Sequence, residues 1–268
     1  IKSQPIYFDK NNPDVMFTTF ASGVVDKIAY GNKRSIESID IKIDVDNKNE
    51  KVFNSYRLAE VKKIDKEKIK ETICASGLWP VLRSRPFSKI ARPSSMPKSI
   101  FIKACNTAPF SPSLKVVCEH LDFDNLQAGC YALSKLFNVD IHMFLPSGFT
   151  FETFNKLDNI NLHTFTGPHP SGNIGYHIAN VDPIESKDTE VWYLCIQDLH
   201  AIGKLFLKGC VDWCRIVSFG GHPDSAINRH LKISRGILIS RLIGDLDCDL
   251  YRLISGDVFS GKKIDQSN

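Results

Sequence analysis

The chain has 268 residues, of which 43% are hydrophobic and 24% are charged, and its formal net charge is +4. This composition is typical of a globular protein and excludes a wholly disordered or fibrous one. The length favours two or three modules over one. A small positive charge spread over the whole chain does not predict a nucleic-acid partner, because such partners require a concentrated basic face.

Two further observations concern the chain as a whole. No apolar run reaches the roughly 18 residues of a membrane-spanning helix. The sequence opens with Ile1, in the middle of what reads as a turn and a strand. We therefore expect a fragment of a longer protein without a membrane span of its own.

The first 46 residues alternate apolar and polar side chains in short runs, which predicts half-buried antiparallel strands. The predicted strands cover residues 5–8, 15–20, 23–29 and 39–45. Asn12-Pro13, Ser22-Gly23 and Gly31-Asn32 supply the turns between them. The polar and charged stretch 47–63 that follows predicts a linker.

Residues 64–212 alternate between helical and strand patterns. A first helix is predicted with Asp65 as its N-cap and Gly77 as its end. A second is predicted from a capping box of Asp124 and Gln127, and a third over residues 198–208. Strands are predicted at residues 99–105, 139–144, 160–165 and 191–196. This alternation predicts a mainly parallel sheet flanked by helices.

Residues 213–268 change pattern once more and predict a small α+β unit. The expected order is a strand at 215–219, a Gly220-Gly221 turn, a strand at 230–234, a short helix at 237–243 and a strand at 251–255. Asp257 in LISGDVFSG reads as a turn residue and not as a catalytic carboxylate.

The stretch GLWPVLRSRPF, residues 77–87, interleaves cations with aromatic side chains. Arg83 and Arg85 lie near Trp79 and Phe87, an arrangement found where proteins bind phosphates, stacked rings or acidic partners. Solvated arginines on a connecting loop are the commoner alternative. The stretch has no glycine cluster, which points away from a flavin enzyme.

Two more candidate sites follow predicted strands. Gly167, Gly172 and Asn173 lie in GPHPSGNIGYH, whose backbone amides are suited to an anion or a ring, although a plain connecting turn is the alternative. Asn106 begins the stretch Asn106-Thr107-Ala108-Pro109, at the carboxyl end of a strand, where open α/β sheets usually bind ligands. That stretch has no carboxylate, so we expect no acid–base chemistry there.

Neither a metal nor a catalytic nucleophile is predicted. His169 and His177 have no third ligand nearby in sequence. The eight cysteines form no Cys-x-x-Cys spacing and predict reduced thiols: Cys74, Cys105, Cys118, Cys130, Cys195, Cys210, Cys214 and Cys248. No Ser-His-Asp or Cys-His pairing has an informative spacing.

Five stretches occur in an order that is similar to one known family. They are QPIYFDKNNPDVMFTTFASGVV (4–25), GLWPVLRSRPF (77–87), GPHPSGNIGYHI (167–178), IGKLFLKG (202–209) and LISGDVFSG (253–261). Together they resemble the A subunit of the sodium-translocating NADH:quinone oxidoreductase. The resemblance implies that the family's extreme N-terminus and its C-terminal region are missing from this chain.

The resemblance also implies an α/β multidomain fold. It comprises a β-rich barrel-sandwich hybrid fragment at 1–46, a linker at 47–63, a Rossmann-like parallel α/β domain at 64–212 and a small β-grasp domain at 213–268. The Rossmann-like domain is similar to the flavin domain of respiratory complex I. Where flavin-bearing relatives have a glycine-rich loop, this chain has bulky residues 79–83, and where they have acidic residues it has Asn106-Thr107-Ala108. We therefore expect no flavin, nicotinamide, iron–sulfur, biotinyl or lipoyl group here, with flavins and an iron–sulfur centre in other subunits.

The role implied is that of a peripheral, non-catalytic subunit on the cytoplasmic side of the bacterial inner membrane, docked on the membrane-embedded quinone-reducing subunit of a sodium pump. A quinone is the one ligand that the resemblance allows. The residues expected to face the quinone or the partner are Trp79, Arg83, Arg85, Phe87, Asn106, Gly167, His169, Gly172 and Asn173. Two alternatives stay open: a flavin- or NAD-binding electron-transfer subunit of a complex like complex I or Rnf, and an autonomous adaptor that recruits partners by exposed sheet edges.

Overall fold

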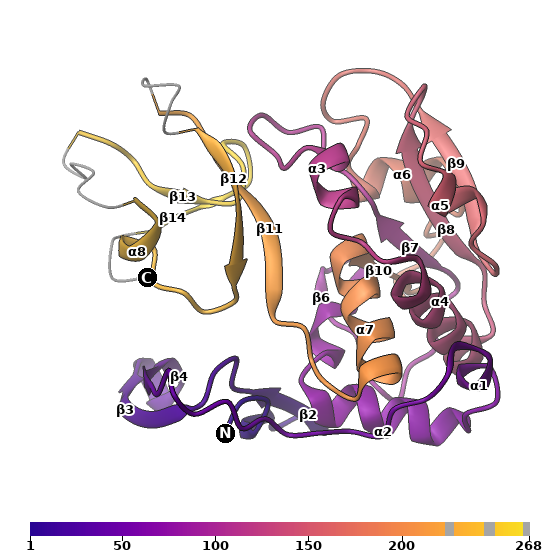
Figure 1. The fold of residues 1–268 in the computed structure, drawn as a ribbon. Helices are drawn as coiled ribbons and strands as arrows, with labels where there is room; N and C mark the ends of the chain where they lie inside the picture. Colours follow the sequence, from indigo (N-terminus) through magenta and orange to yellow (C-terminus); the bar gives the residue numbers. More distant parts are fainter. Residues whose placement is uncertain (223–227, 244–249, 265–268) are drawn as a thin grey trace.

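The computed structural model describes residues 1–222, 228–243 and 250–264. An N-terminal β unit, an α/β domain around a six-stranded sheet, and a C-terminal unit of short strands follow one another along the chain (Figure 1). The β3–β4 and β11–β12 ribbons both lie on the same side of the α/β domain in Figure 1.

The N-terminal unit contains two antiparallel ribbons, and its four strands lie near the four predicted ones. The predicted turn at Asn12-Pro13 is wrong, because both residues belong to β2. β1 (Pro5–Asp9) pairs with β2 (Asn12–Thr18), and β3 (Gly23–Tyr30) pairs with β4 (Ile36–Ile43). The expectation of half-buried strands is wrong for β3 and β4. Val24 is 72% exposed and Tyr30 is 61% exposed, because no second layer of described residues packs on this ribbon.

The segment expected to be a linker, 47–63, is packed against the α/β domain over part of its length. The backbone N–H groups of Phe53 and Tyr56 each donate a 2.8 Å hydrogen bond, to the carbonyls of Gly209 and Phe206. A short helix, α1 (Leu58–Val61), ends with the fully buried Val61. These hydrogen bonds hold the segment against the C-terminal end of the helix that contains Phe206, α7 (Ile196–Lys208).

Helix α2 (Lys66–Ser76) begins and ends where the sequence predicts. The Asp65 carboxylate accepts a 2.9 Å hydrogen bond from the Glu67 N–H and so satisfies one of the free donors of the first turn. Gly77 ends the helix with φ +82°, a left-handed conformation that side chains other than glycine rarely adopt. The short 3₁₀ turn η2 (Trp79–Val81) follows directly.

The central sheet has the strand order β6–β5–β10–β7–β8–β9. Its four parallel strands are β7 (Ile100–Lys103), β8 (Ile141–Pro146), β9 (Asn161–Phe165) and β10 (Val191–Cys195). The expected mainly parallel sheet is thus confirmed. From β7 the chain passes to the neighbouring strand β8 and then to β9, and it returns to the opposite side of β7 at β10. This arrangement creates a topological switch point between β7 and β10, where open α/β sheets bind ligands.

An antiparallel edge that the sequence pattern does not predict extends the sheet beyond β10. It consists of β5 (Arg83–Arg85) and β6 (Lys89–Ile90). The three residues Arg-Ser-Arg of β5 show no apolar alternation, so this strand is defined by its pairing with β10 and β6 and not by its sequence.

Helices cover both faces of the sheet. One face packs on α2, α4 (Phe123–Phe137) and α7 (Ile196–Lys208) through Ile100 and Ile102, and the other packs on α6 (Ile174–Val181) through Phe101. Two short helices, α3 (Leu114–Cys118) and α5 (Glu152–Asn155), lie in the connections. Helix α4 begins two residues earlier than predicted, because Asp122 and not Asp124 caps it, by accepting from the Asn125 N–H.

The described part of the C-terminal unit contains β11 (Cys214–Phe219), β12 (Arg229–Ser234), α8 (Ser240–Ile243), β13 (Ile254–Ser255) and β14 (Lys262–Lys263). Among the described residues these strands form two separate antiparallel ribbons, β11–β12 and β13–β14. The predicted strands at 215–219 and 230–234 are confirmed. The predicted helix begins three residues late, and Cys248 lies outside the described residues.

Candidate functional site

Two of the predicted loops converge at the carboxyl edge of the parallel strands. The hydroxyl of Thr107, after β7, accepts a 3.1 Å hydrogen bond from the Gly172 N–H and lies 3.2 Å from the His169 Nδ1. A Cβ atom on Gly172 would lie 2.7 Å from the Thr107 methyl carbon, so only glycine permits this approach. The sequence-predicted stretches 106–109 and 167–173 therefore do meet.

The remaining candidate residues of these two loops support their conformation. Gly167 has φ +110°, and its carbonyl accepts a 2.7 Å hydrogen bond from the Ser171 hydroxyl. Asn173 precedes α6 as its N-cap residue, without a side-chain cap. The Asn106 side chain accepts from the Ala108 N–H at 3.2 Å.

A C-terminal turn is the third loop of this cluster. The Phe259 ring stacks on His169 with ring centroids 5.1 Å apart. The Asp257 carboxylate accepts 2.8 Å hydrogen bonds from the Phe259 N–H and from the N–H and hydroxyl of Ser260, which confirms its predicted role as a turn residue. The hydrogen bond from the Ser260 side chain is the main reason why the pKa of Asp257 lies below its usual value.

An apolar cavity of about 530 Å³ adjoins this cluster. It lies between Pro109 and Phe110 of the loop after β7, the inward face of the β11–β12 ribbon, and the segment that reaches Asp257. Leu231 and Ile233 are among the apolar side chains of the ribbon that line it. A volume of this size is in the range of small-molecule sites.

Trp79 lies elsewhere, in the core of the α/β domain. Its side chain is fully buried, its Nε1 donates a 2.7 Å hydrogen bond to the Ala91 carbonyl, and its ring meets Trp192 edge-on at 6.2 Å. The prediction that Trp79 faces a quinone or a partner is therefore wrong. The η2 turn places the indole in the core, where it packs on Trp192. The sequence of this loop has no hydrophobic periodicity that would indicate whether the side chain points inward or outward.

The segment around Phe87 and the loop 167–173 lie at opposite ends of the sheet. Strand β5 is antiparallel to β10, and Arg85 pairs with Val191, the first residue of β10. The β5–β6 turn is consequently at the amino edge of the parallel strands, whereas Gly167 follows the carboxyl end of β9. Strands β7 and β8 separate β10 from β9.

Arg85 and Phe87 belong to a surface at that amino edge. The Arg85 guanidinium carbon lies 5.3 Å from the Tyr193 ring, a cation–π distance. The Arg85 Nε is buried and has no hydrogen-bond partner in the described parts of the chain, and Phe87 is 70% exposed. Phe87 is therefore exposed and Arg85 only partly so, and the prediction that both face a partner stays a prediction.

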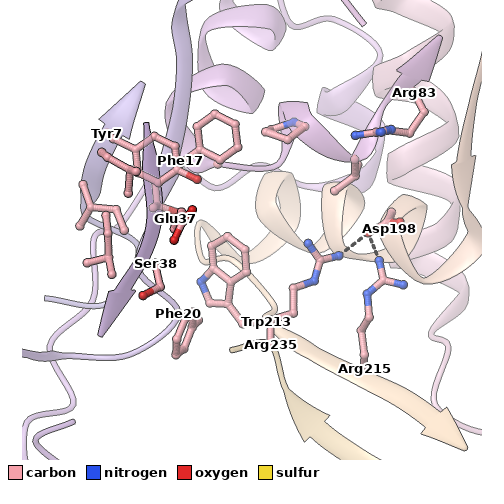
Figure 2. A pocket seen from close by; sticks show the side chains of 17 residues that line it. Tyr7, Phe17, Phe20, Glu37, Ser38, Arg83, Asp198, Trp213, Arg215 and Arg235 are labelled. Atoms are coloured by element: carbon pink, nitrogen blue, oxygen red, sulfur yellow. Dashed lines mark hydrogen bonds and ion pairs between the residues drawn. The ribbon is translucent and has the colours of Figure 1, made fainter. Parts of the chain in front are cut away.

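A groove of about 640 Å³ is the feature that the sequence did not predict (Figure 2). It lies between the N-terminal unit, the η2 turn, the start of α7 and the β11–β12 ribbon. Figure 2 shows aromatic side chains, Tyr7, Phe17 and Phe20, on one side of it and the cations Arg83 and Arg215 on the other.

Asp198 organises the cationic side of this groove. It lies in the first turn of α7, its side chain is 8% exposed, and its carboxylate accepts hydrogen bonds from both Arg215 and Arg235. Burial is the largest cause that lowers the pKa of Arg235, and the nearby Arg215 cation adds to it, whereas Asp198 opposes both. The sequence suggested only that Asp198 begins a helix, because Arg215 in β11 and Arg235 just after β12 are distant from it in sequence.

Most histidines and cysteines elsewhere in the described part of the chain are at least half-buried. Burial lowers the pKa of His142, His163 and His177 and raises the pKa of the Cys74, Cys118 and Cys130 thiols to about 12. The seven cysteines within the described ranges are free, and Cys214 is exposed. Within residues 1–222, 228–243 and 250–264, no three His, Cys, Asp or Glu side chains gather in a way that would hold a metal ion.

The fold is that of a multidomain protein in which an N-terminal unit of two β ribbons precedes an α/β domain with a mixed, mostly parallel sheet. The family model of the NqrA N-terminal barrel-sandwich hybrid domain matches residues 1–44, and the model of the NqrA second alpha/beta domain matches residues 64–211. The chain belongs to the NqrA family.

Curated relatives support this assignment. Each is named as the A subunit of a Na(+)-translocating NADH-quinone reductase. The chain is 38% identical over 263 residues to the one in Histophilus somni strain 2336, 36% over 265 residues to that in Klebsiella pneumoniae strain 342 and 36% over 264 residues to that in Pasteurella multocida strain Pm70. The matches cover 97% or 98% of this chain, which spans 57% or 58% of the length of these relatives.

No helix in the described part of the chain is both long and apolar enough to cross a membrane.

Proposed function

We propose that this chain is part of the peripheral NqrA subunit of a respiratory sodium pump that couples NADH oxidation and quinone reduction to Na⁺ export. The observation that carries the proposal is the 38% identity, over 97% of the chain, to a relative named as that subunit. In this role the chain performs no electron or proton transfer of its own. It positions the membrane-embedded quinone-reducing subunit on the cytoplasmic side of the bacterial inner membrane.

The absence of a flavin from this chain is part of the proposal, and packing supports it. Leu78, Trp79 and Leu82 are all fully buried in the stretch where a nucleotide-binding relative has bare glycine backbone. Gly77 ends α2, and a Cβ there would lie 2.4 Å from the Thr18 hydroxyl, so this glycine is required by helix capping and by close packing. The residues present thus do not fit a flavin phosphate. The flavins and the iron–sulfur centre of the pump are then carried by other subunits.

The division into domains is also a proposal. Residues 1–46 would form the barrel-sandwich hybrid fragment, 47–63 the connection, 64–212 a Rossmann-like domain and 213–268 a β-grasp domain. The strand order β9–β8–β7–β10 supports the Rossmann-like assignment, because it matches the order 3-2-1-4 of that fold. The antiparallel β11–β12 ribbon followed by α8 is compatible with a β-grasp unit.

Docking on the membrane subunit is assigned to the surface of Arg83, Arg85 and Phe87. Replacing Arg83 and Arg85 together with glutamate is expected to reduce the amount of membrane subunit that co-purifies with the chain at least about tenfold, because reversed charges at an interface repel an acidic partner. The melting temperature is expected to change little, since both side chains are partly exposed.

A matched control reverses two exposed lysines at the start of α2, Lys63→Glu and Lys66→Glu, and should leave co-purification intact. A sharp fall in melting temperature with co-purification preserved would instead make Arg83 and Arg85 structural residues.

A contribution to quinone binding is assigned to the apolar cavity beside the His169 cluster, which has apolar walls and polar ends. A short-chain ubiquinone analogue is expected to bind the chain saturably in calorimetry. Leu231→Trp, which fills the cavity, should weaken that binding at least about tenfold, since a filled pocket loses the buried contact area of its ligand. Val24→Trp places the same ring on an exposed strand and should bind as the wild type does. Equal binding by both variants, or no saturable heat at micromolar analogue, would remove this assignment.

A further inference from the structure

The groove of Figure 2 shares Arg83 with the proposed docking surface, and its other lining residues take no part in the docking and quinone functions proposed above. It combines an aromatic wall with an excess of cations. Five charged side chains line it. Three are cations, Arg83, Arg215 and Arg235, and two are carboxylates, Asp198 and Glu37. Their formal charges leave one positive charge uncompensated. A monoanion would neutralise the groove, whereas a dianion or a cation would leave it charged.

The arrangement of hydrogen bonds shows where the uncompensated positive charge lies. Arg215 and Arg235 share the single carboxylate of Asp198. Arg83 donates to the backbone carbonyl of Ser88, a neutral acceptor that leaves its charge uncompensated. Because a guanidinium has five N–H donors, each of these side chains has capacity for a further acceptor. Burial of Arg235 makes an additional anion there more favourable than at a free surface.

The opposite wall is suited to a ring. Tyr7 and Phe17 stack with centroids 4.4 Å apart and an interplanar angle of 9°, which presents one continuous aromatic surface. Trp213 lies between this surface and the arginines in Figure 2, and the Arg235 guanidinium carbon is 5.8 Å from its ring. The Trp213 Nε1 donates to the Ser3 hydroxyl at 3.1 Å, so the indole is held by the N-terminal unit.

We propose that this groove is a binding site for an aromatic compound that carries a single negative charge. Its anionic group binds the guanidinium groups of Arg83 and Arg235, and its ring packs between Trp213 and the Tyr7–Phe17 wall. The volume of about 640 Å³ accommodates a ligand of two or three fused or linked rings. The site shares Arg83 with the proposed docking surface, but binding of a small anion to the chain alone and co-purification of a membrane subunit are measured separately, so either assignment can fail without the other.

The test uses two fluorescent probes with nearly the same rings, anionic 1-anilinonaphthalene-8-sulfonate and neutral N-phenyl-1-naphthylamine. The 268-residue chain is expected to bind the sulfonate saturably, with energy transfer from Trp213 that disappears in Trp213→Phe. Trp79 and Trp192 are fully buried in the α/β core and remain as the background donors. The neutral probe should bind at least about tenfold more weakly, because it makes no charge-assisted hydrogen bond.

Arg83→Gln should weaken sulfonate binding about tenfold and leave the neutral probe unaffected, and Arg83→Lys should retain most of the affinity because it keeps the charge. Arg92→Gln removes an exposed arginine that does not line the groove and should bind both probes as the wild type does. Equal affinity for the two probes, or unchanged sulfonate binding in Arg83→Gln, would overturn the proposal. If Arg83→Gln fails to fold, the comparison of the two probes on the wild-type chain decides it.

Discussion

Replacing Trp79 with alanine is expected to destabilise the chain by about 4 kcal/mol, the cost typical of removing a large buried aromatic side chain. The indole is fully buried, packs on Trp192 and Phe137, and donates a hydrogen bond to the Ala91 carbonyl. Its removal leaves a cavity in the core and an unpaired carbonyl oxygen, and both effects act in the same direction. Urea unfolding followed by far-ultraviolet circular dichroism measures the change.

Phe87→Ala is the matched control, because Phe87 belongs to the same motif but is 70% exposed. Its free energy of unfolding should change by less than about 0.5 kcal/mol. If Trp79→Ala were as mild as Phe87→Ala, the indole would be at the surface and would not fill the space of a nucleotide phosphate.

Replacing Gly203 with alanine is expected to cost about 3 kcal/mol or more, since overpacking at a backbone contact forces two elements apart. A Cβ atom on Gly203, in α7, would lie 1.6 Å from the backbone oxygen of Asn125 in α4. Gly129 of α4 makes the reciprocal approach, with its Cβ position 2.4 Å from the Leu199 oxygen. Neither helix can yield locally, because the blocking atoms are backbone atoms. The distance between the axes of α4 and α7 must therefore increase where they cross.

Gly175→Ala in α6 provides the contrast for this prediction. A Cβ atom there would meet nothing within 4 Å, so helix propensity alone should make the variant neutral or more stable by up to about 1 kcal/mol. Thermal unfolding of Gly203→Ala and Gly175→Ala separates a steric clash between helices from the general effect of an alanine within a helix. A similar response at the two positions would mean that α4 and α7 are not in backbone contact.

Local signals in the sequence predicted the elements whose ends are fixed by their own residues. Helix α2 is an example, because Asp65 caps its first turn and Gly77 adopts the left-handed conformation at its end. Strands β7, β8 and β10 were predicted because they are mainly apolar runs buried on both faces, whereas β9 has exposed polar residues. The five motifs with their order then led to the family, which the matches over residues 1–44 and 64–211 confirm.

Features that depend on pairing across the chain were not predictable in this way. The orientation of β5 is set by its partner β10, so the place of the β5–β6 turn at the amino edge could not be read from Arg-Ser-Arg. The groove is the clearest case. Asp198, Arg215 and Arg235 each have an ordinary local explanation, and only the packing of the β11–β12 ribbon against α7 brings them together.

Trp79 illustrates a different difficulty. An aromatic side chain beside arginines has two physical interpretations, a stacking surface or a core residue flanked by solvated charges. The 3₁₀ turn that decides between them has no periodic signal. The structure assigns Trp79 to the core and leaves Arg85 and Phe87 at the surface.

The most direct test of the claim that this chain positions a partner and carries no redox group is its visible absorption spectrum after purification under native conditions. Under the proposed function, the buried Trp79 and Leu82 stand where a flavin's phosphate would rest, so we predict no band between about 350 and 500 nm. A flavin band in stoichiometric amount would contradict the claim.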